Sequence, residues 1–117
     1  MRTMKEVHDA NCAVACCADI IGAKWTALIL HDLSEGPRRF SELEHACPGI
    51  SPRTLSERLR NLETETIVER HSYAETPPRV EYELTAKGKA LMPIIACMRD
   101  FGHTWLVADE NHRHSHG

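Results

Sequence analysis

The sequence contains no apolar run close to the roughly 18 residues that a membrane-spanning helix needs. Its first six residues, MRTMKE, contain no apolar signal region and no small-residue cleavage site. Both absences favour a cytoplasmic protein. The sequence also lacks a nucleotide-binding loop, a catalytic triad and a carboxylate pair, which argues against an enzyme. A thiol peroxidase that uses Cys12 is the enzymatic alternative, and catalytic peroxide turnover would support it.

A basic excess is also absent. The 14 Lys and Arg residues are outnumbered by 17 Asp and Glu residues, which gives a net charge of -3 at pH 7 and argues against a nonspecific nucleic-acid binder. Residues 24–60 nevertheless carry six basic and five acidic side chains, so any nucleic-acid binding must use a local face. The five cysteines are an odd number, which disfavours a fully paired set of disulfides.

A chain of 117 residues is sufficient for one domain. We assign residues 1–110 to this domain and residues 111–117, which are rich in histidine, to a flexible tail. Apolar residues at helical spacing between Cys12 and Leu33, interrupted near Gly22, predict two successive helices.

A helix-turn-helix pattern follows. Ser41 and Glu44 fit a capping box at the start of a short helix, which ends by Cys47 because proline and glycine come next. Ser51 then fits the N-cap of a helix over residues 52–65, with proline at its first position. Two helices joined by a four-residue turn are typical of a helix-turn-helix.

The helix over residues 52–65 has two stripes at a period of 3.6 residues. Three leucines form the stripe that we expect to be buried. The other stripe carries groups that form hydrogen bonds and suits a major groove: Arg53, Ser56, Glu57 and Arg60.

A β-hairpin and a last helix complete the pattern. Residues 67–73 are rich in strand formers, residues 74–78 must turn, and residues 79–84 alternate apolar and polar side chains. Thr85 then fits the cap of a final helix whose apolar stripe is longer than one small domain needs. The sequence therefore predicts a mainly α fold with a small β-hairpin, a winged helix-turn-helix that dimerises through its N- and C-terminal helices.

Six stretches in this order span most of residues 12–105. They are a cysteine-led segment from Cys12 to IGAKW (21–25), LIL (28–30), GPRRFSEL (36–43), PGIS (48–51), LSERL (55–59) and PPRVEYELT (77–85). Together they resemble the HxlR family of bacterial transcription regulators, and such an ordered set is far more specific than a lone helix-turn-helix. The resemblance implies dimers that bind operator DNA, often as repressors, with some members sensing oxidants, quinones or aldehydes through cysteine.

Base reading is assigned to the exposed stripe. We expect Arg53 and Arg60 to pair with guanine, each good bidentate pair giving about 1–3 kcal/mol of discrimination. Glu57 either accepts a hydrogen bond from cytosine or orients one of these arginines. The alternative for each arginine is a solvated charge or an intrahelical ion pair, such as Arg60 with Glu57 or Glu63.

Phosphate contacts are assigned to residues around this helix. Hydroxyl groups near its start are expected to position the domain with help from the helix N-terminus; they belong to Ser51, Thr54 and Ser56. Further electrostatic attraction is expected from Arg79 in the wing and from Arg38, Arg39 and Lys24. A two-fold dimer would place its recognition helices roughly 34 Å apart on a pseudo-palindromic operator.

Cys12 is the best candidate for a reactive thiolate. It lies at a predicted helix start, where unpaired amides favour an anion, and it matches the family's N-terminal cysteine, although Ala13 stands where proline commonly follows. We predict that Cys12 senses oxidants or electrophiles, with Cys47 or Cys97 of the partner subunit as its disulfide partner. The alternatives are a buried, inert Cys12 and an apolar effector that binds between the first and last helices.

Other interpretations of the cysteines and histidines stay open. His8, Cys12 and Cys16 fall one helical turn apart, which would present three soft ligands to zinc or copper, yet a fourth ligand is not evident. Whether Cys17 or the tail histidines His112, His114 and His116 bind metal stays open, a frayed polar terminus being the commoner meaning of such a tail, and we expect no cofactor. A winged helix that binds protein is the last alternative, favoured by the acidic balance and opposed by the arginines of the predicted DNA-binding face.

Overall fold

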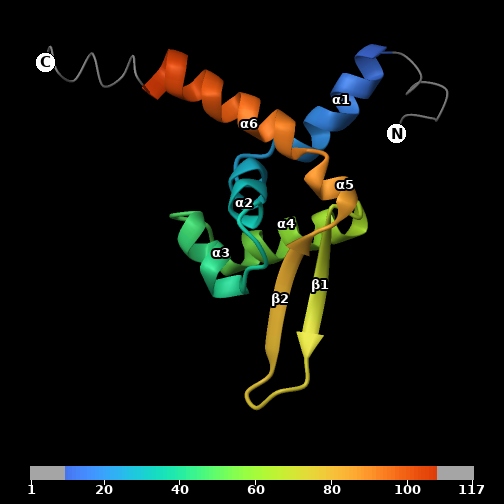
Figure 1. Cartoon of the computed structure of the whole chain (residues 1–117), viewed down its shortest axis with the longest axis vertical. Helices are drawn as coiled ribbons and strands as arrows, with labels where there is room; N and C mark the ends of the chain where they lie inside the picture. Colours follow the sequence, from blue (N-terminus) through green and yellow to red (C-terminus); the bar gives the residue numbers. More distant parts are fainter. Residues whose placement is uncertain (1–9, 108–117) are drawn as a thin grey trace, which may run out of the picture.

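The computed structural model describes residues 10–107, so the predicted tail (111–117) and His8 lie outside the described residues. The elements follow one another as shown in Figure 1. They are α1 (Ala10–Ile21), α2 (Thr26–Leu33), α3 (Phe40–Ala46), α4 (Pro52–Thr64), β1 (Val68–Tyr73), β2 (Arg79–Leu84), α5 (Ala86–Lys89), α6 (Met92–Phe101) and the π-helical segment η2 (Gly102–Val107). The predicted class, mainly α with one antiparallel hairpin in a winged helix-turn-helix, is confirmed.

The turn between α3 and α4 forms as its sequence predicts. The N–H of Thr54 donates a hydrogen bond to Ser51 Oγ at 3.0 Å, so Ser51 caps α4 and proline occupies the first turn. Gly49 has φ 94°, a backbone conformation that costs glycine little. These local signals fix the start of α4, which ends at Thr64.

The predicted capping box of α3 is wrong. The helix begins at Phe40, and the carboxylate of Glu42 accepts the backbone N–H of Arg39 at 2.7 Å, so the reciprocal pair expected at Ser41 and Glu44 does not form. The cause is long-range pairing. Arg38 and Tyr82 exchange two backbone hydrogen bonds, of 2.9 and 2.8 Å, which hold the chain extended just before α3.

The wing is a two-stranded antiparallel hairpin whose register runs from Val68 opposite Leu84 to Tyr73 opposite Arg79. Tyr82 and Leu84 bury their side chains in the core, whereas the turn residues 74–78 are all exposed. The core lies under α2, α3 and α4, and its fully buried side chains are Ile29, Leu30, Leu43, Cys47, Leu55, Leu59 and Ile67.

The predicted single C-terminal helix is divided. Thr85 Oγ1 accepts the N–H of Gly88 at 3.0 Å and caps only the short α5. Pro93 then lies in the first turn of α6. Backbone N–H groups in a first turn have no partner within the helix, so the missing N–H of proline costs nothing there and a new helix begins. A Cβ at Gly88 would overlap the carbonyl oxygen of Ile67, so only glycine lets α5 approach the wing this closely.

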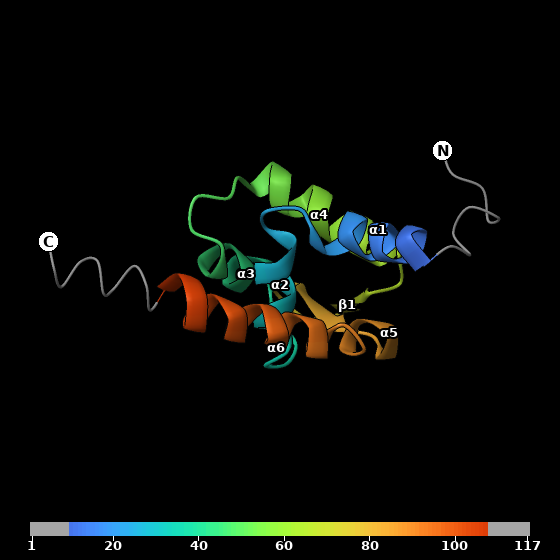
Figure 2. The same cartoon turned by 90° about the horizontal axis from the view of Figure 1, so that it is seen from above.

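The helices α1 and α6 lie at one end of the molecule, and the wing tip lies at the other (Figure 1). Viewed from above, α6 runs beyond the helices that it covers (Figure 2). Its apolar stripe is largely exposed, with Phe101 58% and Trp105 63% accessible. In residues 10–107 no single helix is long and apolar enough to cross a membrane. One pair of successive helices, Cys12–Ile21 and Thr26–Leu33, has sufficient combined length and apolar composition, but the two are bent by 77° relative to each other.

Candidate nucleic-acid interface

The helix α4 presents the predicted polar stripe to solvent. Its opposite face is fixed in the core, because Leu55, Leu59 and Leu62 are at most 3% exposed. The stripe residues Arg53, Ser56, Glu57 and Arg60 are all exposed. A polar face on a helix anchored in this way keeps its position when it meets a ligand, because the buried leucines hold the backbone.

The two arginines of the stripe differ in their partners. Arg53 Nε lies 3.3 Å from Glu57 Oε1, so Glu57 orients Arg53, one of the two roles predicted for it. The Arg53 side chain is 90% exposed, and such a pair exchanges easily for another partner. Among the described residues no side chain pairs with Arg60, so the alternative to base reading, an ion pair with Glu57 or Glu63, does not form. Arg60 is therefore the cation of the stripe that is available without rearrangement.

The hydroxyl groups at the start of α4 are partly committed to the cap. Ser51 Oγ accepts the N–H of Thr54 and donates to Thr54 Oγ1 at 2.9 Å. Its hydroxyl hydrogen is used, so Ser51 has no hydroxyl donor for a phosphate in this arrangement. The hydroxyl hydrogen of Thr54 is left for another acceptor, as is that of the exposed Ser56.

In the wing, Arg79 is tied to carboxylates rather than available to DNA. Its guanidinium donates to Glu75 Oε2 at 2.8 Å and to Glu81 Oε2 at 2.7 Å, and its Cζ lies 4.0 Å from the centre of the Tyr73 ring. The hydrogen bond that Arg79 donates to Glu75 is the main cause that raises the pKa of Arg79 above its usual value. This geometry runs against the predicted role of Arg79 as an electrostatic contact.

The sequence analysis missed Arg70, the other arginine of the hairpin. Arg70 is exposed on β1, and its hydrogen-bond partner among the described residues is Ser72 Oγ, at 3.2 Å, rather than a carboxylate. The sequence did contain a signal that Arg79 would be paired and Arg70 left over, because Glu75 and Glu81 lie four and two residues from Arg79. The wing cation that is available to a phosphate is therefore Arg70.

The remaining predicted cations surround the turn before α4 and the root of the wing. Arg38 is partly buried, with Nε 3.2 Å from Asp32 Oδ2, and so supports the structure. Arg39 is exposed at the start of α3. Lys24 stacks its Nζ 4.7 Å from the Trp25 ring centre, and that ring packs beside the Gly49 turn.

The thiols occupy very different environments. Cys12 is partly exposed in the first described turn of α1, and Cys97 is exposed on α6. Cys47 is fully buried, and this burial, followed by the negative charge of Asp32, raises the pKa of its thiol. Cys47 therefore cannot meet another subunit unless the core opens, which runs against its predicted role as the partner of Cys12. Within residues 10–107 no three His, Cys, Asp or Glu side chains are arranged to hold a metal ion.

Comparison with known families identifies the family of the chain. The family model described as HxlR-like helix-turn-helix matches residues 20–110. The chain belongs to this family. As an HxlR-type protein it is a DNA-binding transcription regulator with a winged helix-turn-helix fold, as its sequence predicted.

Individual relatives agree with this assignment. The HTH-type transcriptional regulator YvaP of Bacillus subtilis (strain 168) is 49% identical over 88 residues, which are 75% of this HxlR-type chain and 82% of YvaP. Among solved structures, the redox regulator HypR in its reduced form superposes with a TM-score of 0.79 at 37% identity, covering 85% of this chain and 98% of HypR. The reduced form of the transcriptional regulator YodB from B. subtilis gives 0.70 at 37% identity, with 86% and 96% covered.

Proposed function

We propose that this HxlR-type regulator acts in the cytoplasm as a homodimeric repressor that binds an inverted-repeat operator. The observation that carries the proposal is the exposed polar stripe on α4, a helix that three buried leucines hold in place. An α-helix with such a stripe fits the major groove, where base edges present distinct patterns of donors and acceptors. Each subunit would read one half-site, so the operator would mirror the two-fold symmetry of the dimer.

The proposed contacts follow from which side chains are available. Arg60 reads a guanine directly, and Arg53 reads another after Glu57 releases it or turns to cytosine. Thr54 and Ser56 bind phosphates beside the N-terminus of α4. Arg70 replaces Arg79 as the wing contact, while Arg39 and Lys24 contribute attraction at longer range.

Dimerisation is proposed through α6 together with α1. The stripe formed by Ile94, Met98, Phe101 and Trp105 is between 38% and 63% exposed, and Val14 on α1 is 69% exposed. Large apolar side chains along one helix are costly to leave in water and suit a symmetric helix pair. In this arrangement α4 stays on the outside of the dimer, where DNA can reach it.

Regulation is proposed to act through Cys12. HypR is a redox regulator with solved oxidised and reduced forms, which supports a thiol switch here. An oxidant would remove two electrons and two protons as Cys12 joins a second thiol. Cys97 of the partner subunit is the exposed choice, because Cys47 lies in the core. A bond between subunits would change the spacing of the two α4 helices and so the operator affinity.

The test is fluorescence anisotropy of the duplex upstream of the protein's own gene, titrated with reduced and then with diamide-oxidised protein at one fixed salt concentration. Tight binding of the reduced protein alone is expected. Cys12→Ser is expected to bind in both conditions, with Cys17→Ser as the matched control that still responds. Equal binding of the reduced and oxidised protein would refute the switch but keep the regulator, and no specific binding would refute the proposed operator.

The second candidate is a regulator of the same DNA-binding type that responds to a small ligand without thiol chemistry. A cavity between α1 and α4 favours it.

A further inference from the structure

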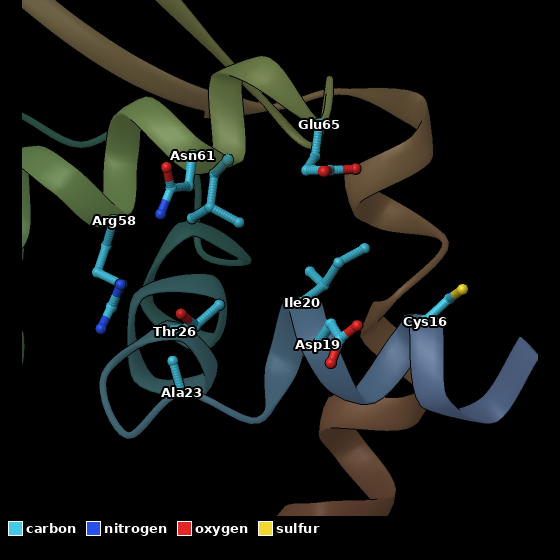
Figure 3. Close-up of a pocket in the computed structure, with 9 residues that line it drawn as sticks. Cys16, Asp19, Ile20, Ala23, Thr26, Arg58, Asn61 and Glu65 are labelled. Atoms are coloured by element: carbon cyan, nitrogen blue, oxygen red, sulfur yellow. The ribbon is translucent and has the colours of Figure 1, made fainter. Parts of the chain in front are cut away.

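A cavity of about 390 Å³ separates α1 and the start of α2 from the recognition helix α4 (Figure 3). Its size lies within the range of small-molecule sites. In the close-up, Arg58 and Asn61 extend from α4 toward Ala23 and Thr26, while Glu65 lies at the C-terminal end of that helix. The DNA-reading stripe of α4 plays no part in this lining, which is Cys16, Asp19, Ile20, Ala23, Thr26, Arg58, Asn61, Leu62 and Glu65.

Arg58 carries a buried nitrogen, Nε, that has no hydrogen-bond partner among residues 10–107. A buried donor without an acceptor is unfavourable, and the planar fork of arginine matches the two oxygens of a carboxylate. The geometry at this end of the cavity therefore suits an organic anion.

The other end of the cavity has the opposite character. Glu65 follows Arg58 by seven residues and is the C-cap of α4, which places the two positions roughly 10 Å apart along the helix axis. Its carboxylate accepts hydrogen bonds but donates none at neutral pH. Between the two ends, Ile20, Ala23 and Leu62 contribute apolar surface, and Asp19 beside Ile20 adds a second carboxylate to the wall. A ligand that suits all three regions carries an anion at one end, a cationic amine at the other and an apolar body between.

We propose that this cavity is a binding site for a small amino-carboxylate whose carboxylate pairs with Arg58 and whose ammonium group faces Glu65. Asn61 supplies a further donor beside the carboxylate. No bond is made or broken in binding, so the site is a reversible one. Cys16 forms part of the wall and takes no chemical role.

The site is also a regulatory one, and this half of the inference rests on the proposed operator binding. Arg58 and Asn61 belong to the same helix as Arg53 and Arg60, and Glu65 is its C-cap. A ligand held between α4 and the α1–α2 segment adds contacts that depend on the position of α4 relative to α1. Since α1 is part of the proposed dimer interface, such contacts change the placement of the two reading helices. Ligand and operator are then thermodynamically coupled, and each alters the affinity of the other.

Isothermal titration calorimetry of the full chain with para-(aminomethyl)benzoate tests the cavity without DNA. We expect saturable binding at millimolar concentration, about tenfold weaker in Arg58→Gln and unchanged in the control Lys89→Gln, which removes an exposed cation outside the cavity. Arg58→Lys, which keeps the charge without the fork, is expected to fall between these. Benzylamine and benzoate, which each lack one charged group, are expected to bind more weakly.

Absence of saturable binding, or binding that Arg58→Gln leaves unchanged, would overturn the site. The operator titration, repeated with saturating para-(aminomethyl)benzoate, tests the coupling. We expect the affinity of the wild-type protein to change about fivefold or more and that of Arg58→Gln to stay constant. Calorimetric binding without any change in operator affinity would overturn the regulatory half. Failure of the ligand-free protein to bind the duplex would instead refute the proposed operator, while calorimetry still decides the cavity.

Discussion

The two wing arginines, Arg70 and Arg79, are expected to respond differently to substitution by alanine. Arg70 has no carboxylate partner among the described residues, whereas Arg79 is bound by two. A cation that contacts a phosphate releases condensed counterions, which steepens the salt dependence of DNA binding. A cation already paired with carboxylates releases none. Arg70→Ala should therefore flatten the dependence of log K on log salt, and Arg79→Ala should leave its slope unchanged.

The size of the effect follows from the two-fold symmetry. Each phosphate contact contributes about 0.9 to the slope, so two copies of Arg70 contribute about 1.8. Between 50 and 200 mM salt, the affinity ratio of wild type to Arg70→Ala should fall by about 12-fold. Anisotropy titrations at four salt concentrations measure this slope. A slope that Arg79→Ala lowers as much as Arg70→Ala does would refute the assignment of wing roles, provided that circular dichroism melts show both variants folded.

Three further predictions concern stability. Leu59→Ala should lower the free energy of unfolding by about 2–5 kcal/mol in urea denaturation, because the side chain is 1% exposed; a smaller loss would mean that the core closes around the gap. The pKa of Cys47 lies above its ordinary value of 9.0 in the folded protein, so stability should be intact below pH 9 and decline above it as the unfolded state ionises first. Cys47→Ala should remove that part of the alkaline decline, and an identical pH profile in both proteins would contradict the assignment. Thr85→Ala should cost about 1 kcal/mol through loss of the α5 cap, and Ser72→Ala, an exposed control in β1, should not change the melting temperature by a comparable amount.

Signals that act over a few residues were sufficient to predict most of the fold. Ser51 and the Pro-Gly turn before it set the start of α4, and three leucines at helical spacing set its buried face. Alternation in residues 79–84 gave the inner face of β2 correctly, because Tyr82 and Leu84 are buried. In each case the residue and its partner are neighbours in sequence or share one regular element.

Long-range contacts explain what the sequence did not predict. The start of α3 depends on the pairing of Arg38 with Tyr82, 44 positions away, which no local pattern reveals. The unsatisfied Nε of Arg58 depends on where α1 lies relative to α4, and periodicity places Arg58 only between the two stripes of its helix. The burial of Cys47 was missed because a residue at the end of a short helix has no full turn from which to infer its inward face.

The pairing of Arg38 with Tyr82 divides the hairpin into two parts that we expect to differ in amide exchange. At its base, both backbone groups of Tyr82 are hydrogen-bonded to a third strand segment, and amide exchange there should be as slow as in the core. Beyond Val80 the hairpin has only its two strands and an exposed turn, and exchange should be fast. The hairpin can thus bend at its outer half while its base stays fixed beside the core. Operators of different groove width could then be accommodated by the wing without any displacement of α4.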